Sequence, residues 1–146
     1  QMALGSITVF RAQHLSLDAD ANRNPIDAWD IPAIAHHYET FIRHWSQVLP
    51  RIAAGDITGA EAVRTRTEVM DTYRRFPVLD PMLPTELMPT EWPRTQAREV
   101  FVAVYDGLAE AAEQHVRTIV ACHADEPGPD IRAHTVSDMS IDHHAR

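Results

Sequence analysis

Apolar residues recur along residues 31–52 with the three- and four-residue spacing of an amphipathic helix. The apolar positions are Ile34, Ala35, Tyr38, Phe41, Ile42, Trp45, Val48, Leu49 and Ile52. Asp30 is a suitable N-cap for this helix, and Pro32 falls in the first turn, where its missing N–H is harmless. Because Pro50 should end or kink the helix, the pattern predicts a helix from Ile31 to about Leu49.

A second amphipathic segment begins at Thr58 and ends at Phe76, just before Pro77. Thr58 and Glu61 have the spacing of a capping box, in which the hydroxyl and the carboxylate bind first-turn amides reciprocally. The apolar stripe of this segment consists of Ala62, Val63, Val69, Met70, Tyr73 and Phe76. We expect this second helix to pack against the first.

A third apolar stripe predicts a helix that begins after Thr95, a possible cap, and ends near Cys122. The stripe consists of Ala97, Val100, Phe101, Val104, Tyr105, Leu108, Ala112, Val116, Ile119 and Val120. Gly107 lies inside it and costs about 1 kcal/mol relative to alanine. We interpret this glycine as a tolerated weak position, and a close approach between helices is the alternative.

Residues 78–93, between the second and third helices, combine many prolines with large apolar side chains. The prolines are Pro81, Pro84, Pro89 and Pro93, and the apolar residues are Leu79, Met82, Leu83, Leu87, Met88 and Trp92. Prolines cannot donate backbone hydrogen bonds, so the segment is predicted to be a loop. Because loops normally avoid so many apolar side chains, we expect this one to be a clamp that lies pinned across the helices.

The two ends of the chain differ from the helical region. Residues 7–13 are β-prone and predict a strand whose partners lie elsewhere. We assign residues 1–17 to the end of a preceding domain or to a cloning remnant, and 18–28 to a linker. Residues 29–123 then form a helical domain, and 124–146 form a weakly ordered acidic tail. The predicted fold class is mostly α, a small bundle of three main helices with the apolar clamp loop.

Composition narrows the possible functions. The 146 residues are sufficient for one domain with extensions. Twenty-one acidic residues against thirteen basic ones give a net charge of -8, which argues against direct binding to a nucleic-acid backbone. Cys122 is the single cysteine and cannot form an internal disulfide, and no apolar run approaches membrane-spanning length. A cytoplasmic protein is therefore expected.

Catalytic and metal chemistry have weak support in the sequence. His36, His37, Glu39 and His44 crowd one predicted helix, but the common zinc and di-iron motifs are missing. Cys122 is placed at a helix C-terminus, where the dipole disfavours the reactive thiolate. A small metal-dependent helical enzyme that uses the histidine cluster is thus an alternative hypothesis, and the preferred prediction has no catalytic residue, metal or cofactor.

One region brings cations and an aromatic side chain together around the clamp loop. The candidate binding residues are Arg74, Arg75, Trp92, Arg94 and Arg98. Guanidinium groups bind carboxylate or phosphate in a fork, and an indole beside them offers a flat apolar wall. Acidic neighbours favour the more common role of such arginines, which is to anchor a loop through ion pairs. These neighbours are Asp71, Asp80, Glu91 and Glu99.

The same region carries a series of short motifs. They are Tyr73-Arg74-Arg75-Phe76, Leu79-Asp80-Pro81-Met82-Leu83-Pro84, Glu86-Leu87-Met88-Pro89 and Glu91-Trp92-Pro93, with Ala28-Trp29-Asp30 upstream and Ala97, Arg98, Phe101 and Tyr105 downstream. From Trp29 to Val120 the series resembles the C-terminal region of PaaX-like transcriptional repressors, the regulators of phenylacetate catabolism. The sequence departs from the usual family pattern at Arg94, where glycine is common, and at Met82 and Met88, where leucine is commoner.

The resemblance implies a repressor with an N-terminal winged-helix DNA-binding domain, a middle α/β domain and this helical domain. The predicted strand at 7–13 is similar to the end of that middle domain, so residues 1–17 would be its last part. It implies an aryl-CoA thioester such as phenylacetyl-CoA as the effector that releases operator DNA. It also implies a homodimer that matches a palindromic site. The chain would then be the effector-sensing and oligomerisation domain, and operator DNA would be bound only through the winged-helix domain. A purely structural dimerisation domain is a further alternative.

Overall fold

The computed structural model describes residues 25–123 and 130–138, and this part of the chain contains helices and no strand. The elements are η1 (Pro25–Ala28), α1 (Ile31–Ser46), α2 (Leu49–Ala53), α3 (Gly59–Tyr73), α4 (Phe76–Leu79), η2 (Thr85–Leu87), α5 (Arg94–Gly107) and α6 (Ala109–His123). The predicted mostly α fold class is therefore confirmed. The expected strand at 7–13, with the rest of segment 1–17, lies outside the described residues.

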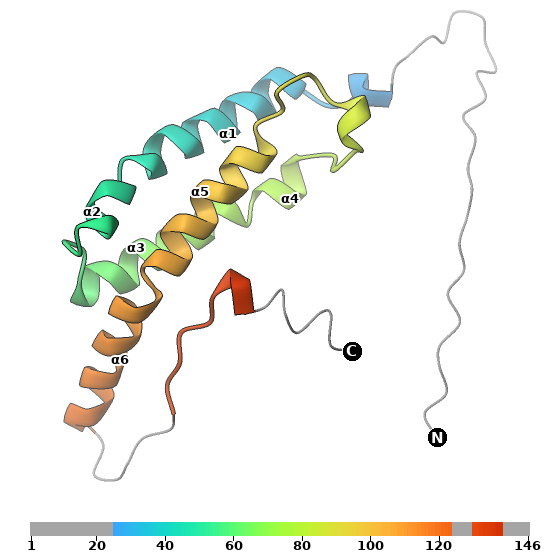
Figure 1. Ribbon diagram of the computed structural model, residues 1–146. Helices are drawn as coiled ribbons and strands as arrows, with labels where there is room; N and C mark the ends of the chain where they lie inside the picture. Colours follow the sequence, from blue (N-terminus) through green and yellow to red (C-terminus); the bar gives the residue numbers. More distant parts are fainter. Residues whose placement is uncertain (1–24, 124–129, 139–146) are drawn as a thin grey trace, which may run out of the picture.

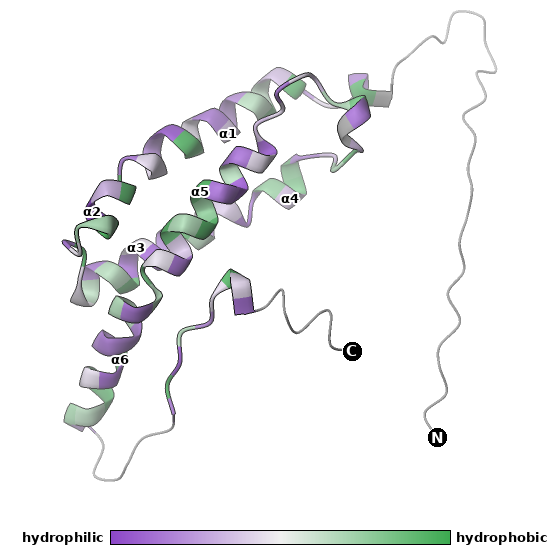
Figure 2. Ribbon diagram, in the orientation of Figure 1, coloured by the Kyte–Doolittle hydropathy of each residue, from purple (hydrophilic) through white to green (hydrophobic). Residues whose placement is uncertain are grey.

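Helix α5 occupies the middle of the bundle. It packs against α1, α2 and α3, while α6 packs mainly against α3 (Figure 1). Hydrophilic and hydrophobic positions alternate along these helices, as amphipathic elements around one core require (Figure 2). The fully buried side chains with the largest volume are those of Tyr38, Leu108, Val69 and Val104.

Aromatic rings fill much of the core between α1, α3 and α5. Tyr38 stacks on Phe76 with ring centroids 4.0 Å apart, and Tyr73 stacks on Phe101 at 4.1 Å. Phe41 lies edge-on to Phe76 at 5.4 Å and thereby joins the two pairs. The core is thus built from rings contributed by four helices, which the periodicity had already placed on the apolar stripes.

Each apolar stripe continues over two helices. The first predicted helix ends at Ser46, three residues before the predicted Leu49, and the short helix α2 carries Pro50 in its first turn. The second ends at Tyr73, three residues before the predicted Phe76, and Pro77 lies in the first turn of α4. The third predicted helix is interrupted at Leu108, at the point where it passes very close to α2. A Cβ atom on Gly107 would lie 2.9 Å from the Ile52 side chain. The interpretation of Gly107 as a tolerated weak position is therefore wrong, and the close approach is correct.

The predicted helix caps have mixed outcomes. Asp30 caps α1 by accepting a hydrogen bond from the Ala33 N–H at 3.0 Å, as expected. Thr58 makes no side-chain cap bond, because Gly59 starts α3 with a φ of 58° and Glu61 pairs instead with Arg51 at 2.9 Å. The capping box and the cap at Thr95 are thus both wrong, since α5 begins at Arg94 after Pro93.

The segment expected as an apolar clamp loop is only partly pinned. Its start forms the helical turn α4, and η2 forms within it. Met88 is buried, but four large apolar side chains are exposed, with exposed fractions of 41% or more. These are Val78, Leu79, Met82 and Leu87. The clamp expectation is therefore wrong for three of the six apolar residues it named, Leu79, Met82 and Leu87, and polar contacts help to hold the loop in place.

Residues 130–138 depart from the expected weakly ordered tail. We call them the C-terminal strap, and they lie along α3, α5 and α6 (Figure 1). Residues 136–138 form one helical turn. The strap contributes Val136 to the edge of the hydrophobic core. The linker expected at 18–28 is described only at its end, where Pro25–Ala28 forms η1.

Candidate functional site

A buried carboxylate, that of Asp80, organises the region where the sequence predicted a binding site. Its side chain is fully buried at the C-terminal end of α4. It accepts hydrogen bonds from the Tyr38 hydroxyl at 2.8 Å, from Trp92 Nε1 at 3.1 Å and from Arg94 at 2.5 and 2.9 Å. The Met82 N–H also donates to it at 2.7 Å. Every acceptor position of this carboxylate is therefore in use.

The electrostatics of the Asp80 network follow from this geometry. Burial alone would raise the pKa of Asp80, but hydrogen bonds from Arg94, the Met82 N–H, Tyr38 and Trp92 outweigh burial and lower it to about 2. Burial and the bond to Asp80 raise the pKa of Tyr38, and Asp80 raises the pKa of Arg94. All three groups keep their charge state near neutral pH, so the network is suited to holding elements together and not to proton transfer.

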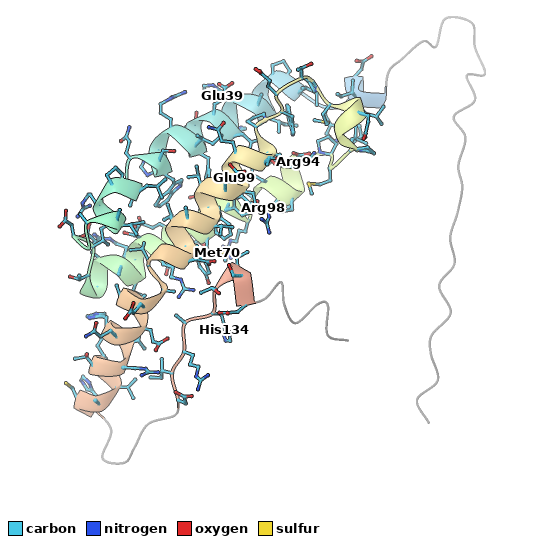
Figure 3. All side chains as sticks on the ribbon, in the orientation of Figure 1. Glu39, Met70, Arg94, Arg98, Glu99 and His134 are labelled. Atoms are coloured by element: carbon cyan, nitrogen blue, oxygen red, sulfur yellow. The ribbon has the colours of Figure 1, made fainter. Side chains whose placement is uncertain are left out.

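The five predicted binding residues do not converge on one point. Trp92 and Arg94 are engaged by Asp80, and Arg74 pairs with Asp71 at 3.1 Å on the surface. Arg98 is exposed one turn after Arg94 on α5 (Figure 3). The ion-pair role therefore holds for Arg74 and Arg94.

Arg75 occupies a different place from Arg74, although the two are adjacent. It lines a cavity of about 490 Å³ between α1 and the end of α3 with α4. Within the described residues, the Arg75 side chain makes no hydrogen bond or ion pair. The cavity is lined by His37, Thr40, Phe41, His44, Trp45, Glu68, Thr72, Arg75, Phe76 and Leu79.

This cavity combines apolar rings with positive charge. Phe41, Trp45 and Phe76 are buried aromatic residues that form its wall, and Trp45 is in edge contact with His44 at 4.9 Å. Its one acidic residue is Glu68, which lies 4.0 Å from Arg64. A planar apolar group with an attached anion fits such a site chemically. The sequence pattern did not predict this cavity, because the residues of its wall have the spacing of ordinary core residues.

The histidine cluster does not assemble as a metal site in the part of the chain that is described. His37 and His44 line the cavity beside Arg75, which we call the aromatic cavity. Glu39, labelled on α1 in Figure 3, lines a separate surface cavity together with Glu91. Across residues 25–123 and 130–138, no three histidine, cysteine or acidic side chains come together in a way that could hold a metal ion. The metal-dependent alternative therefore has no support from the described geometry.

Two further features bear on the nature of the chain. No helix in the described ranges is both long enough and apolar enough to cross a membrane. The exposed Cys122 lies at the end of α6, one residue before its last.

Comparisons with known proteins agree with the motifs of the loop. The family model of the PaaX-like protein C-terminal domain matches residues 29–118, which include α1 to α5 and most of α6. The transcriptional repressor PaaX of Escherichia coli (strain K12) is 32% identical over 111 residues, which are 73% of this chain and 35% of that protein. The chain thus spans about a third of the length of this relative. No solved structure matches the chain. On the extent of both matches, the chain belongs to the PaaX-like protein C-terminal domain family.

Proposed function

We propose that this chain is the effector-sensing and oligomerisation part of a transcriptional repressor that controls an aromatic, phenylacetate-type catabolic operon. The observation that carries the proposal is the family match over residues 29–118, together with a relative described as a transcriptional repressor. In this proposal operator DNA is bound by a winged-helix domain that is not part of this sequence. The net charge of -8 supports that division of labour, because an acidic chain is repelled by DNA phosphates.

The proposed effector is an aryl-CoA thioester such as phenylacetyl-CoA. Support comes from the aromatic cavity, where the acyl ring would stack among Phe41, Trp45 and Phe76. Arg75 would face the anionic part of the molecule, since its guanidinium has no partner among the described side chains. Effector binding at Arg98, which is exposed, stays a prediction from the sequence, as it does for Arg74, Trp92 and Arg94.

The proposed assembly is a homodimer, because a two-fold protein matches a palindromic operator. A purely structural dimerisation domain, with the effector held elsewhere in the repressor, is the second candidate. The two candidates differ in one measurable property, which is whether this chain itself binds the thioester.

Thermal denaturation tests the proposal directly. Phenylacetyl-CoA should raise the Tm of this chain by several degrees, because a ligand at 100 times its Kd adds about 2.7 kcal/mol. Free CoA and phenylacetate should raise it less, since each carries only part of the molecule.

Two adjacent arginines provide matched variants for this experiment. Arg75→Gln should abolish most of the Tm shift, whereas Arg74→Gln, whose arginine pairs with Asp71 outside the cavity, should retain it. Loss in the Arg74 variant alone would reject the cavity as the site. A dimer by light scattering with no shift from any ligand would reject effector sensing and leave the structural dimerisation domain.

A further inference from the structure

The C-terminal strap is held by charged side chains from three helices. Arg117 of α6 donates to the Ile131 carbonyl at 2.9 Å, and Glu113 of α6 accepts from the Ala133 N–H at 2.9 Å. Arg66 of α3 donates to the carbonyl of His134, the strap residue labelled in Figure 3. Asp106 of α5 accepts from the Val136 N–H at 2.8 Å and from the Ser137 hydroxyl at 3.0 Å. We call the surface formed by Arg66, Asp106, Glu113 and Arg117 the strap groove.

The strap groove recognises mainly the main chain; its two side-chain contacts are those of Asp106 with the Ser137 hydroxyl at 3.0 Å and of Arg117 with Asp130 at 3.5 Å. Its two arginines bind carbonyls and its two acidic residues bind amides, in the order carbonyl, amide, carbonyl, amide along the strap. The side chains of Arg132 and His134 are exposed. The half-buried residues of the strap are Ile131, Ala133, Thr135 and Val136, and its other described residues are exposed. An extended peptide with small or apolar residues at those positions satisfies the same bonds.

The groove side chains are fixed in place by contacts of their own. Arg117 and Glu113 form an ion pair at 2.9 Å on neighbouring turns of α6. The Arg66 guanidinium lies over the Tyr105 ring, 4.0 Å from its centroid. Such preorganised charges lose little side-chain entropy when they bind a peptide. The groove is therefore a preorganised peptide-binding surface, and in this structure the strap of the same chain occupies it.

We propose that the strap groove also accepts the strap of a second copy of this chain, so that the homodimer forms by exchange of straps. The identical segment is the one peptide known to satisfy the groove, and exchange replaces each bond with the same bond. The family match ends at residue 118, so the groove residues lie within it and the strap lies beyond it. This inference takes the homodimer from the proposed function, and its other premises are contacts of the described residues.

A labelled synthetic peptide with the sequence of residues 129–138 tests the proposal, with fluorescence anisotropy as the readout. The intact chain should bind it weakly, because its own strap competes. Ala133→Pro removes the N–H that Glu113 accepts and weakens the internal strap. This variant should bind the peptide at least about tenfold more tightly, the size of effect expected for a hydrogen bond to a charged group. A second chain variant, Val136→Pro, should do the same through Asp106.

Two controls separate main-chain recognition from a side-chain effect. Peptide binding to the Ala133→Pro chain should be lost when the peptide is N-methylated at Ala133, and should persist when His134 of the peptide becomes alanine. Adding Asp106→Asn to the Ala133→Pro chain should weaken binding about tenfold. Failure of both proline variants to bind the peptide would overturn strap exchange. If those variants nevertheless remain dimeric by light scattering, the chain forms a homodimer that does not depend on strap exchange.

Discussion

The Asp80 carboxylate binds two of the five residues that the sequence predicted to form a ligand site. The sequence predicted that Arg94 and Trp92 gather near the loop, and the structure places both on the Asp80 carboxylate. Their acidic partner was among four equivalent candidates in the sequence. The choice depends on burial, because Asp80 alone of the four lies at a fully buried position and must be satisfied there. Burial of a charged residue at the end of a short helix depends on the complete fold, and the spacing of apolar residues does not reveal it.

Replacement of this carboxylate gives a first prediction at the scale of the residue. Asp80→Asn keeps the shape of the side chain but removes the charge that neutralises Arg94. We expect a loss of about 3 kcal/mol in the free energy of unfolding, the range found when one partner of a buried ion pair is removed. Urea denaturation measures it. Asp71→Asn, which breaks the exposed pair with Arg74, should cost less than about 1 kcal/mol. Equal losses in the two variants would contradict a special role for burial.

The acid response of the chain follows from the same group. The pKa of Asp80 falls from its ordinary value of 3.8 to about 2 on folding. A carboxylate with a lowered pKa stabilises the folded state above the unfolded pKa, and this contribution is lost as the pH falls through the folded value. A shift of this size corresponds to roughly 2 to 3 kcal/mol.

The measurement compares the free energy of unfolding of the wild type and of Asp80→Asn between pH 6 and pH 2. The difference in free energy of unfolding between the wild type and Asp80→Asn should decrease by about 2 kcal/mol as the pH falls from about 5 to 2. Glu61→Gln serves as the control, because Glu61 pairs with Arg51 on the surface. A gap that stays constant with pH would show that Asp80 does not titrate differently in the two states.

At the scale of the element, periodicity predicted the location of the helices but not their breaks. The stripes around Tyr38, Val69 and Val104 were correct, since spacing along the chain decides which face is apolar. The helix ends before Pro50 and Pro77 were predicted from the prolines, and the observed ends at Ser46 and Tyr73 lie three residues before the predicted Leu49 and Phe76. The division at Gly107 was not predicted, because it lies where one helix approaches another, and that information is not in the spacing. The capping box at Thr58 failed for a similar reason, because Glu61 found a better partner in Arg51.

Because α5 approaches α2 closely, Gly107→Ala should destabilise the wild-type chain but stabilise a chain in which Ile52 is shortened. Gly107→Ala should gain up to about 1 kcal/mol from helix propensity but lose more through overpacking, for a net loss of about 1 kcal/mol. The cause is the contact of the new Cβ atom with Ile52 at 2.9 Å. In an Ile52→Ala background the same substitution should stabilise the chain. Thermal or urea unfolding of the four variants in this double-mutant cycle measures the coupling. Additive effects would show that the helices do not meet at Gly107.

At the scale of the whole molecule, the chain joins parts that are distant in sequence through polar side chains. The strap is bound by α3, α5 and α6, but nothing in its sequence indicates a docking site, and the sequence therefore predicts only a weakly ordered acidic tail there. The aromatic cavity was also invisible, because Phe41, Trp45 and Phe76 have the same periodicity as any buried ring. Contacts of this kind depend on the packing of the complete fold, whereas the family motifs depend on short local strings and could be recognised.

The Asp80 network links segments of the chain that are distant in sequence. It connects Tyr38 to a residue 42 positions later and Arg94 to one 14 positions earlier, so it closes two loops of the chain at a single carboxylate. Small secreted domains achieve such closures with cystine bridges, and this chain contains one cysteine. Here the fastening is a noncovalent crosslink. Thiol reductants should leave it intact, and protonation of Asp80 near pH 2 should weaken it.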